Sequence, residues 1–141
     1  MTLPMILAPL FVLVLMTFVL VFWLAALRAP AFRRGEVRAD DVDLRQPNWP
    51  RRTMQVGNSF SSQFELPVLF YVLTVLAIIS KHADFLFVAM AWIFVLSRIA
   101  HAYIHTTSNN LNLRGPFFGI GAVVLALMWL IFIIRIMFGL P

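Results

Sequence analysis

The stretch QFELPVLFYVL, residues 63–73, places one carboxylate, Glu65, two residues before Pro67 inside an otherwise apolar segment. An isolated charge is costly to bury in a low-dielectric medium, so such a carboxylate is expected to face other protein or a polar cleft and to have a partner. The next apolar segment contains a single charge, Arg98, within FVLSRIAHAYIHTT. These two residues predict a helical membrane protein with a polar site inside the membrane.

The composition of the chain supports a membrane location. Of 141 residues, 62% are hydrophobic and 12% are charged, and the mean hydropathy is +0.91, which is too apolar for a soluble domain. The absence of cysteine excludes a disulfide framework, a thiolate metal site and a thiol nucleophile belonging to the chain itself. The net charge of +5 is concentrated in one loop beside the apolar segments, which indicates membrane topology rather than nucleic-acid binding.

Four apolar segments predict four transmembrane helices, over residues of about 3–27, 56–80, 85–107 and 115–140. Each is long enough to cross a hydrocarbon core of about 30 Å at about 1.5 Å per residue. Pro67 is expected to bend the second helix, because proline cannot donate a backbone hydrogen bond. The chain therefore predicts one domain over residues 1–141, an all-α integral membrane four-helix bundle. A cleaved signal peptide is the alternative for the first segment, which however lacks a preceding basic region.

The first connection, residues 28–53, is expected to be a solvated loop in contact with lipid headgroups. Its arginines predict, by the positive-inside rule, that the first and third loops are cytoplasmic and that both termini lie on the opposite side. The connection between the second and third segments offers only Lys81. The arginines of the loop are Arg28, Arg33, Arg34, Arg38, Arg45, Arg51 and Arg52.

Two polar stripes enter the cytoplasmic halves of the second and third helices. Their members repeat every three or four residues, which places each set on one helix face. They are Asn58, Ser61, Ser62 and Glu65 in the second helix, and Arg98, His101 and His105 in the third. Glu65 and Arg98 both lie about 14 Å from the cytoplasmic ends of their helices. We therefore predict that they approach each other, within one subunit or across a subunit interface, so that loss of either leaves a buried charge unpaired.

The four spans, the basic first loop, FELPVLF in the second span and Arg98 followed by HAYIH in the third make the chain resemble the MAPEG family, as a bacterial-type member. These are the membrane-associated proteins in eicosanoid and glutathione metabolism, and the resemblance covers essentially the whole chain. It implies a homotrimer of four-helix subunits, with glutathione as a co-substrate held between neighbouring subunits near the cytosolic face. Family members are glutathione transferases, glutathione peroxidases, leukotriene and prostaglandin synthases, or non-catalytic lipid-binding relatives.

The resemblance also assigns residues of the second helix to a glutathione site. The family's arginine, asparagine and glutamate correspond most closely to Arg52, Asn58 and Glu65. In the better-known eukaryotic enzymes these three are more closely spaced, and the acid lies three residues before the proline, where this chain has Phe64.

The third and fourth helices supply the remaining candidates. Arg98 matches the third-helix arginine of the family, and His101 and His105 stand where the better-known enzymes tend to have tyrosines that contact glutathione. Arg114 lies near the family's thiolate-stabilising arginine and is the catalytic candidate. A cation beside sulfur favours the thiolate, which would attack a hydrophobic electrophile arriving from the bilayer.

Two other functions remain open on the sequence alone. The first is a non-catalytic lipid-binding or structural membrane protein, in which the buried polar network holds the oligomer together. The second is a metal site at His101 and His105, which are four residues apart. Further ligands are lacking for it, so no metal is predicted.

Overall fold

The computed structural model describes residues 2–42 and 48–141, so Arg45 of the first loop lies outside the described residues. All regular secondary structure in the described part is helical. The helices are α1 (Leu3–Arg33), α2 (Ala39–Val42), α3 (Arg51–Ser62), α4 (Leu66–Ile79), α5 (Phe85–Thr106) and α6 (Leu111–Met137).

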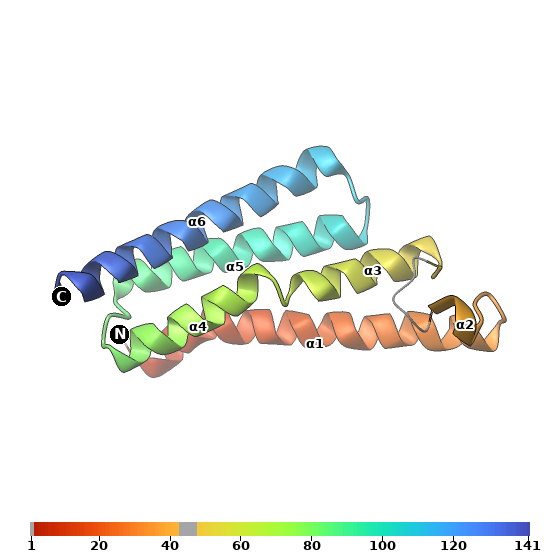
Figure 1. Cartoon of the computed structure of the whole chain (residues 1–141), viewed down its shortest axis with the longest axis horizontal. Coiled ribbons are helices and arrows are strands. Elements are labelled where there is room, and N and C mark those ends of the chain that lie inside the picture. Colours follow the sequence, from red (N-terminus) through yellow and green to blue (C-terminus); the bar gives the residue numbers. More distant parts are fainter. Residues whose placement is uncertain (1, 43–47) are drawn as a thin grey trace.

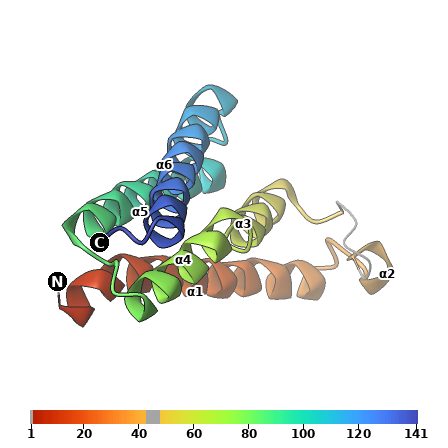
Figure 2. The same ribbon diagram turned by 60° about the vertical axis from the view of Figure 1, so that its left-hand side comes forward.

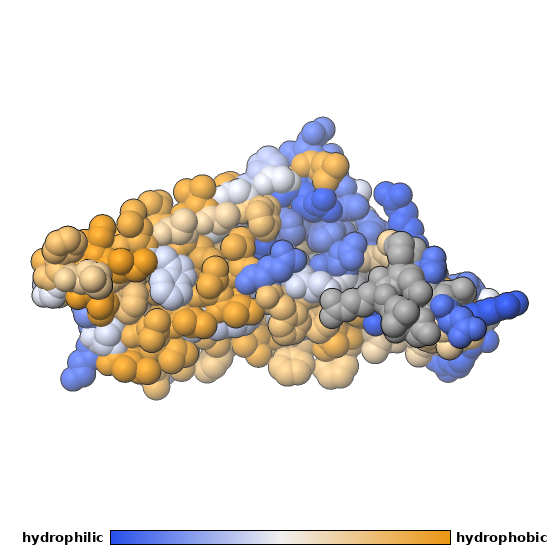
Figure 3. Space-filling model, viewed as in Figure 1, coloured by the Kyte–Doolittle hydropathy of each residue, from blue (hydrophilic) through white to orange (hydrophobic). Residues whose placement is uncertain are grey.

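Four helical segments are long and apolar enough to cross a membrane: Leu3–Arg33, Arg51–Ile79, Phe85–Thr106 and Leu111–Met137. This confirms the prediction of an all-α, multi-pass integral membrane protein. Both ends of the chain lie at the same end of the bundle (Figure 1). On the face shown in Figure 3, hydrophobic residues cover most of the length of the bundle. Hydrophilic residues gather at the end opposite the termini, over α2, the start of α3 and the α5–α6 connection.

The central helix of the bundle is α5, which packs against α1, α3 and α6. The pair α5 and α6 crosses the layer formed by α1, α3 and α4 (Figure 2). The core between these layers includes Leu13, Phe70 and Phe94, and the rings of the two phenylalanines are stacked with centroids 5.1 Å apart. Because lipid tails are as apolar as these side chains, such contacts stabilise the bundle through close packing rather than by removing surface from water.

The prediction that residues 28–53 form a loop was wrong at both ends of that range. Helix α1 continues to Arg33, and α3 begins at Arg51 rather than near residue 56. The charged residues there are accommodated by indole rings: the Arg28 guanidinium lies 4.8 Å from the ring centroid of Trp49, and that of Arg52 lies 5.2 Å from Trp23. Such cation–π contacts let arginines continue a helix beyond the hydrocarbon region.

The second span is broken, not merely bent, at residues 63–65. The N–H groups of these three residues donate to carbonyls three residues earlier, at 3.0, 3.0 and 3.2 Å, which tightens the last turn of α3. In a continuous helix the ring of Pro67 would clash with the carbonyl of Gln63 and leave it without a donor. The chain instead turns at Glu65, with φ −99° and ψ −103°, and α4 begins anew with Pro67 in its first turn.

An ion pair ties α5 to α6 at the end of the bundle where the termini lie. The Arg135 guanidinium is 2.9 Å from the Asp84 carboxylate, and their side chains are 19% and 47% exposed. Asp84 also caps α5 by accepting a hydrogen bond from the Phe87 N–H at 3.0 Å. A second contact holds the chain end, because Nε2 of His82 lies 2.9 Å from the Leu140 carbonyl oxygen.

The Asp84 pair predicts a contribution to stability that depends on pH. Burial raises the pKa of this carboxyl, but the hydrogen bonds from Arg135 and Phe87 outweigh burial and hold the pKa below its usual 3.8. A carboxyl with a lower pKa in the folded state stabilises the fold above the unfolded-state pKa, and this contribution is lost as the pH falls through the folded-state value. We therefore expect the Tm of the protein in detergent to decrease as the pH is lowered below about 4.

The Asp84→Asn variant should have a lower Tm at neutral pH and a smaller further loss on acidification. Asp40→Asn is the matched control, since Asp40 is exposed on α2 at the opposite end, and it should behave as the unmodified protein. An unchanged pH dependence in Asp84→Asn would contradict the assignment.

Candidate functional site in an intramembrane cleft

A cleft of about 520 Å³ lies among α3, α5 and the amino-terminal part of α6. The amino-terminal end of α6 lies away from α3 in both ribbon views (Figures 1 and 2). Helix α3 and the break after it supply a polar wall, and α5 supplies two imidazole rings. These residues are Asn58, Ser61, Ser62, Glu65, His101 and His105.

Most of the site residues predicted from the sequence line the cleft. Among the predicted site residues, those that line it are Asn58, Glu65, His101, His105 and Arg114. The two that do not are Arg52, which is exposed beside Trp23, and Arg98, which is buried in the core. The roles of all seven remain predictions.

Glu65 and Arg98 lie close enough within the subunit to interact electrostatically, but no ion pair joins them among the described residues. The break turns Glu65 outward, where its side chain is exposed in the cleft. Arg98 is 0% exposed and donates instead to Ser62, to its carbonyl at 3.3 Å and its hydroxyl at 2.5 Å. Since Arg98 is sealed within one subunit, a carboxylate of another subunit could reach it only after rearrangement.

The two histidines form a ring cluster in the cleft. The centroid of His101 lies 5.5 Å from that of His105 and 5.7 Å from that of Phe118 on α6. The Nδ1 atoms of both histidines are buried and have no hydrogen-bond partner in the described part of the chain. A neutral imidazole carries one donor and one acceptor nitrogen, so this cluster can bind either kind of polar group.

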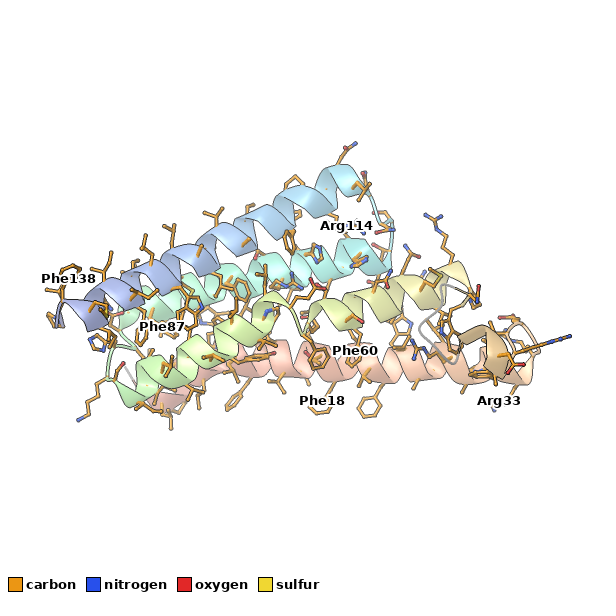
Figure 4. The ribbon with its side chains drawn as sticks, in the orientation of Figure 1. Phe18, Arg33, Phe60, Phe87, Arg114 and Phe138 are labelled. Atoms are coloured by element: carbon orange, nitrogen blue, oxygen red, sulfur yellow. The ribbon has the colours of Figure 1, made fainter. Side chains whose placement is uncertain are left out.

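Arg114 is held by the connection between α5 and α6. Its Nη1 donates to Oδ1 of Asn109 at 2.6 Å. Asn109 adopts a left-handed conformation, with φ 52°, and its N–H donates to the Ile104 carbonyl at 2.7 Å. Asparagine is among the few residues that tolerate this conformation, and it often ends a helix in this way. Figure 4 shows Arg114 near this connection, at the amino-terminal part of α6.

Comparison with known proteins identifies the family. The model of the MAPEG family matches residues 6–134, which include all the residues of the cleft. The chain belongs to the MAPEG family. No curated protein and no solved structure matches it significantly. The fold of this MAPEG protein therefore agrees with the resemblance given by its ELP segment, its third-helix arginine and its four spans.

Four residues of the site in this MAPEG protein belong neither to the predicted site residues nor to the two polar stripes. Leu111, Gly115 and Phe118 line the cleft from α6, and Asn109 orients Arg114 from the preceding connection. Leu111 lies three residues before Arg114 on α6, and Phe118 lies four residues after it. Helical periodicity from Arg114 could therefore have identified Leu111 and Phe118. The role of Asn109 depends on a turn whose conformation the sequence does not specify.

The Asn109 contact predicts a positioning effect that can be separated from folding. Asn109→Gly keeps the left-handed backbone accessible but removes the side-chain oxygen that Arg114 contacts. Loss of one hydrogen bond to a charged group should weaken an anionic ligand's binding in the cleft by about tenfold, measured by calorimetry. The control is Asn112→Gly, at the exposed start of α6. Equal affinity in both variants would exclude the role given to Asn109.

A second cavity in this MAPEG protein is too small for a substrate. It encloses about 20 Å³ beside Phe87, Met128 and Arg135, at the end of the bundle near the termini. This space corresponds to about one water molecule. The larger cleft is therefore the candidate site.

Proposed function

We propose that this MAPEG protein binds glutathione as a co-substrate in the cleft and acts as a transferase or peroxidase on hydrophobic electrophiles. The observation that supports this most strongly is the composition of the cleft. It combines one guanidinium, one carboxylate, two imidazoles and several small polar groups with the apolar side chains of Leu111 and Phe118. Its volume of about 520 Å³ lies within the usual range for sites that take small molecules.

The charged and polar groups of the cleft fit the chemistry of this tripeptide. Glutathione carries two carboxylates, an ammonium group and a thiol. The guanidinium of Arg114 suits an anionic group, and the carboxylate of Glu65 suits the ammonium. Asn58 and Ser61 offer an amide and a hydroxyl to the peptide groups.

Each part of the cleft has a role in this proposal. Bound glutathione supplies a sulfur nucleophile for an electrophilic carbon or peroxide. Arg114 favours the ionised thiol, because a neighbouring cation stabilises the thiolate. Asn109 holds the Arg114 guanidinium in place. Leu111 and Phe118 provide an apolar wall that excludes water and admits a hydrophobic substrate.

The proposal includes a homotrimer whose cleft faces the cytoplasm, as the family resemblance implies. A surface on α6 beside the cleft supports the association of subunits. A Cβ atom added at Gly115 or Gly119 would have no atom within 4 Å, so another helix can approach the backbone closely there. A neighbouring subunit would then cover the open side of the cleft. Cross-linking and the mass of the detergent-solubilised protein test the stoichiometry.

Calorimetry on the solubilised oligomer tests the proposed function. Glutathione and an analogue with alanine in place of cysteine are titrated in parallel. Saturable binding of both would support the site, and tighter binding of glutathione would show that the sulfur contributes. Lack of binding at millimolar glutathione, with the oligomer intact, would contradict the proposal.

A second candidate is a non-catalytic protein that binds a lipid in the same cleft. The observation that favours it is the exposure of Leu111 and Phe118, at 66% and 38%, next to Arg114. An acyl chain could lie on these side chains while its anionic headgroup contacts the guanidinium. Lipid that co-purifies with the oligomer and is lost in Arg114→Ala, together with no affinity for glutathione, would favour this candidate.

A further inference from the structure

Arg98 occupies an unusual position for a residue nominated as a ligand contact. It lies one helical turn before His101 on α5, yet it is 0% exposed and does not line the cleft. Both of its hydrogen bonds go to Ser62, the last residue of α3. A side chain that is sealed in the core cannot contact a ligand in the cleft directly.

The contact with Ser62 places a cation at the carboxyl end of a helix. The final carbonyls of a helix lack intrahelical donors and carry partial negative charge, so a cation there is stabilised. The interruption before Pro67 creates this helix end within the membrane. Arg98 thus caps α3, and the helix end in turn offsets part of the cost of burying the guanidinium.

The capped residue lies next to the cleft carboxylate. Only residues 63 and 64 separate Ser62 from Glu65, and the Glu65 N–H donates to the same Ser62 carbonyl at 3.2 Å. The direction of the Glu65 side chain therefore depends on the carbonyl to which Arg98 donates. Ser62 and Glu65 both line the cleft, so a change at the capped end would alter its polar wall.

We propose that Arg98 is a positioning residue: by capping the carboxyl end of α3 it fixes the break in the second span and directs the Glu65 carboxylate into the cleft. This assignment replaces its role as a ligand-binding residue. It rests on the proposed function only in taking the cleft as the binding site.

The absence of cysteine in the chain allows a direct test. Ser61→Cys introduces a single thiol in the cleft, four residues before Glu65. The thiol is modified with a cationic and an anionic methanethiosulfonate, and the ratio of the two rates reports the local charge. In this background Glu65→Gln should lower the cation-to-anion ratio by about threefold or more, because it removes a nearby negative charge.

The decisive variant is Arg98→Gln in the same background. If Arg98 positions Glu65, the ratio should fall toward that of Glu65→Gln, because the carboxylate is no longer directed into the cleft. If Arg98 acts only through its own charge, the ratio should rise, because a positive charge has been removed. A rise or no change overturns the proposal. Arg98→Lys keeps the positive charge and one donor group, so its cation-to-anion ratio should lie between that of Arg98→Gln and that of the Ser61→Cys background.

A second variant keeps the proposal testable if Arg98→Gln does not assemble. Ser62→Ala removes the hydroxyl acceptor and leaves the Arg98 charge in place. A fall in the ratio supports the capping role, and an unchanged ratio contradicts it. No ligand is needed for these measurements. If the unmodified protein fails to bind glutathione while the ratio falls as expected, the proposed function fails and the positioning role of Arg98 stands.

Discussion

Replacement of Arg114 by alanine is expected to lower the turnover of glutathione with a hydrophobic electrophile by about ten- to a thousandfold, while leaving the oligomer intact. An opposite charge within about 4–6 Å changes an ionisation equilibrium by this factor. Without the guanidinium, a smaller fraction of bound thiol is ionised at neutral pH. The turnover of Arg114→Ala should therefore rise more steeply with pH than that of the unmodified protein. Steady-state rates with a chromogenic electrophile across a pH series measure both effects.

Two variants make the Arg114 result interpretable. Arg51→Ala removes an exposed arginine from the start of α3, away from the cleft, and should leave turnover unchanged. Arg114→Lys retains a positive charge but not the planar guanidinium with its paired donors, so its turnover should lie between that of Arg114→Ala and that of the unmodified protein. Unchanged turnover in Arg114→Ala, with glutathione still bound, would remove the catalytic assignment.

The substitution Gly121→Leu is expected to lower the free energy of unfolding by about 3 kcal/mol, the upper part of the usual range for overpacking a core. Gly121 is buried where α6 crosses α5. A Cβ atom there would lie 2.8 Å from Oγ of Ser97 and 3.7 Å from the ring of Phe94. The Ser97 hydroxyl is itself bonded to the Phe94 carbonyl at 2.6 Å, so it cannot move away without losing that contact. Unfolding in a mixed-detergent series measures the loss.

Gly119→Leu is the matched control on the same helix, because a Cβ atom at Gly119 would have nothing within 4 Å. The unfolding free energy of this variant should change little when it is measured on the dissociated subunit, because the surface around Gly119 is the one proposed to contact a neighbouring subunit. A double-mutant cycle gives a further check: Gly121→Ala should cost less in a Ser97→Ala background, where the crowded oxygen is absent. Equal losses at positions 119 and 121 would show that the helix crossing is looser than described.

The sequence was sufficient for the spans and for one wall of the cleft. Hydropathy located all four membrane-crossing segments, because a helix in lipid needs a long apolar run whatever it packs against. The stripe from Asn58 to Glu65 also came together as predicted, although the helix breaks. Asn58, Ser61 and Ser62 still lie within α3, and the turn that follows carries Glu65 onto the same side.

The partners of the charged residues were not predictable in the same way. Periodicity grouped Arg98 with His101 and His105, but a stripe is wide enough for one member to lie in the core while the others face a cleft. Arg98 donates to Ser62 rather than to Glu65 because the Ser62 carbonyl lacks a full set of helical donors, and it does so only because α3 ends at this residue. The contacts of Asn109 with Arg114 and of Asp84 with Arg135 join residues across a turn and across two helices, which a one-dimensional pattern does not bring together.

The interruption at residues 63–65 has a mechanical consequence for a protein in a bilayer. A continuous helix meets a change in membrane thickness by tilting as one rod. A span made of two shorter helices, α3 and α4, has a joint at which α4 can tilt while Arg98 holds the end of α3 against α5. Since Glu65 lies at that joint, we expect the shape of the cleft to respond to the thickness of the surrounding membrane, so that lipid composition and ligand affinity become linked.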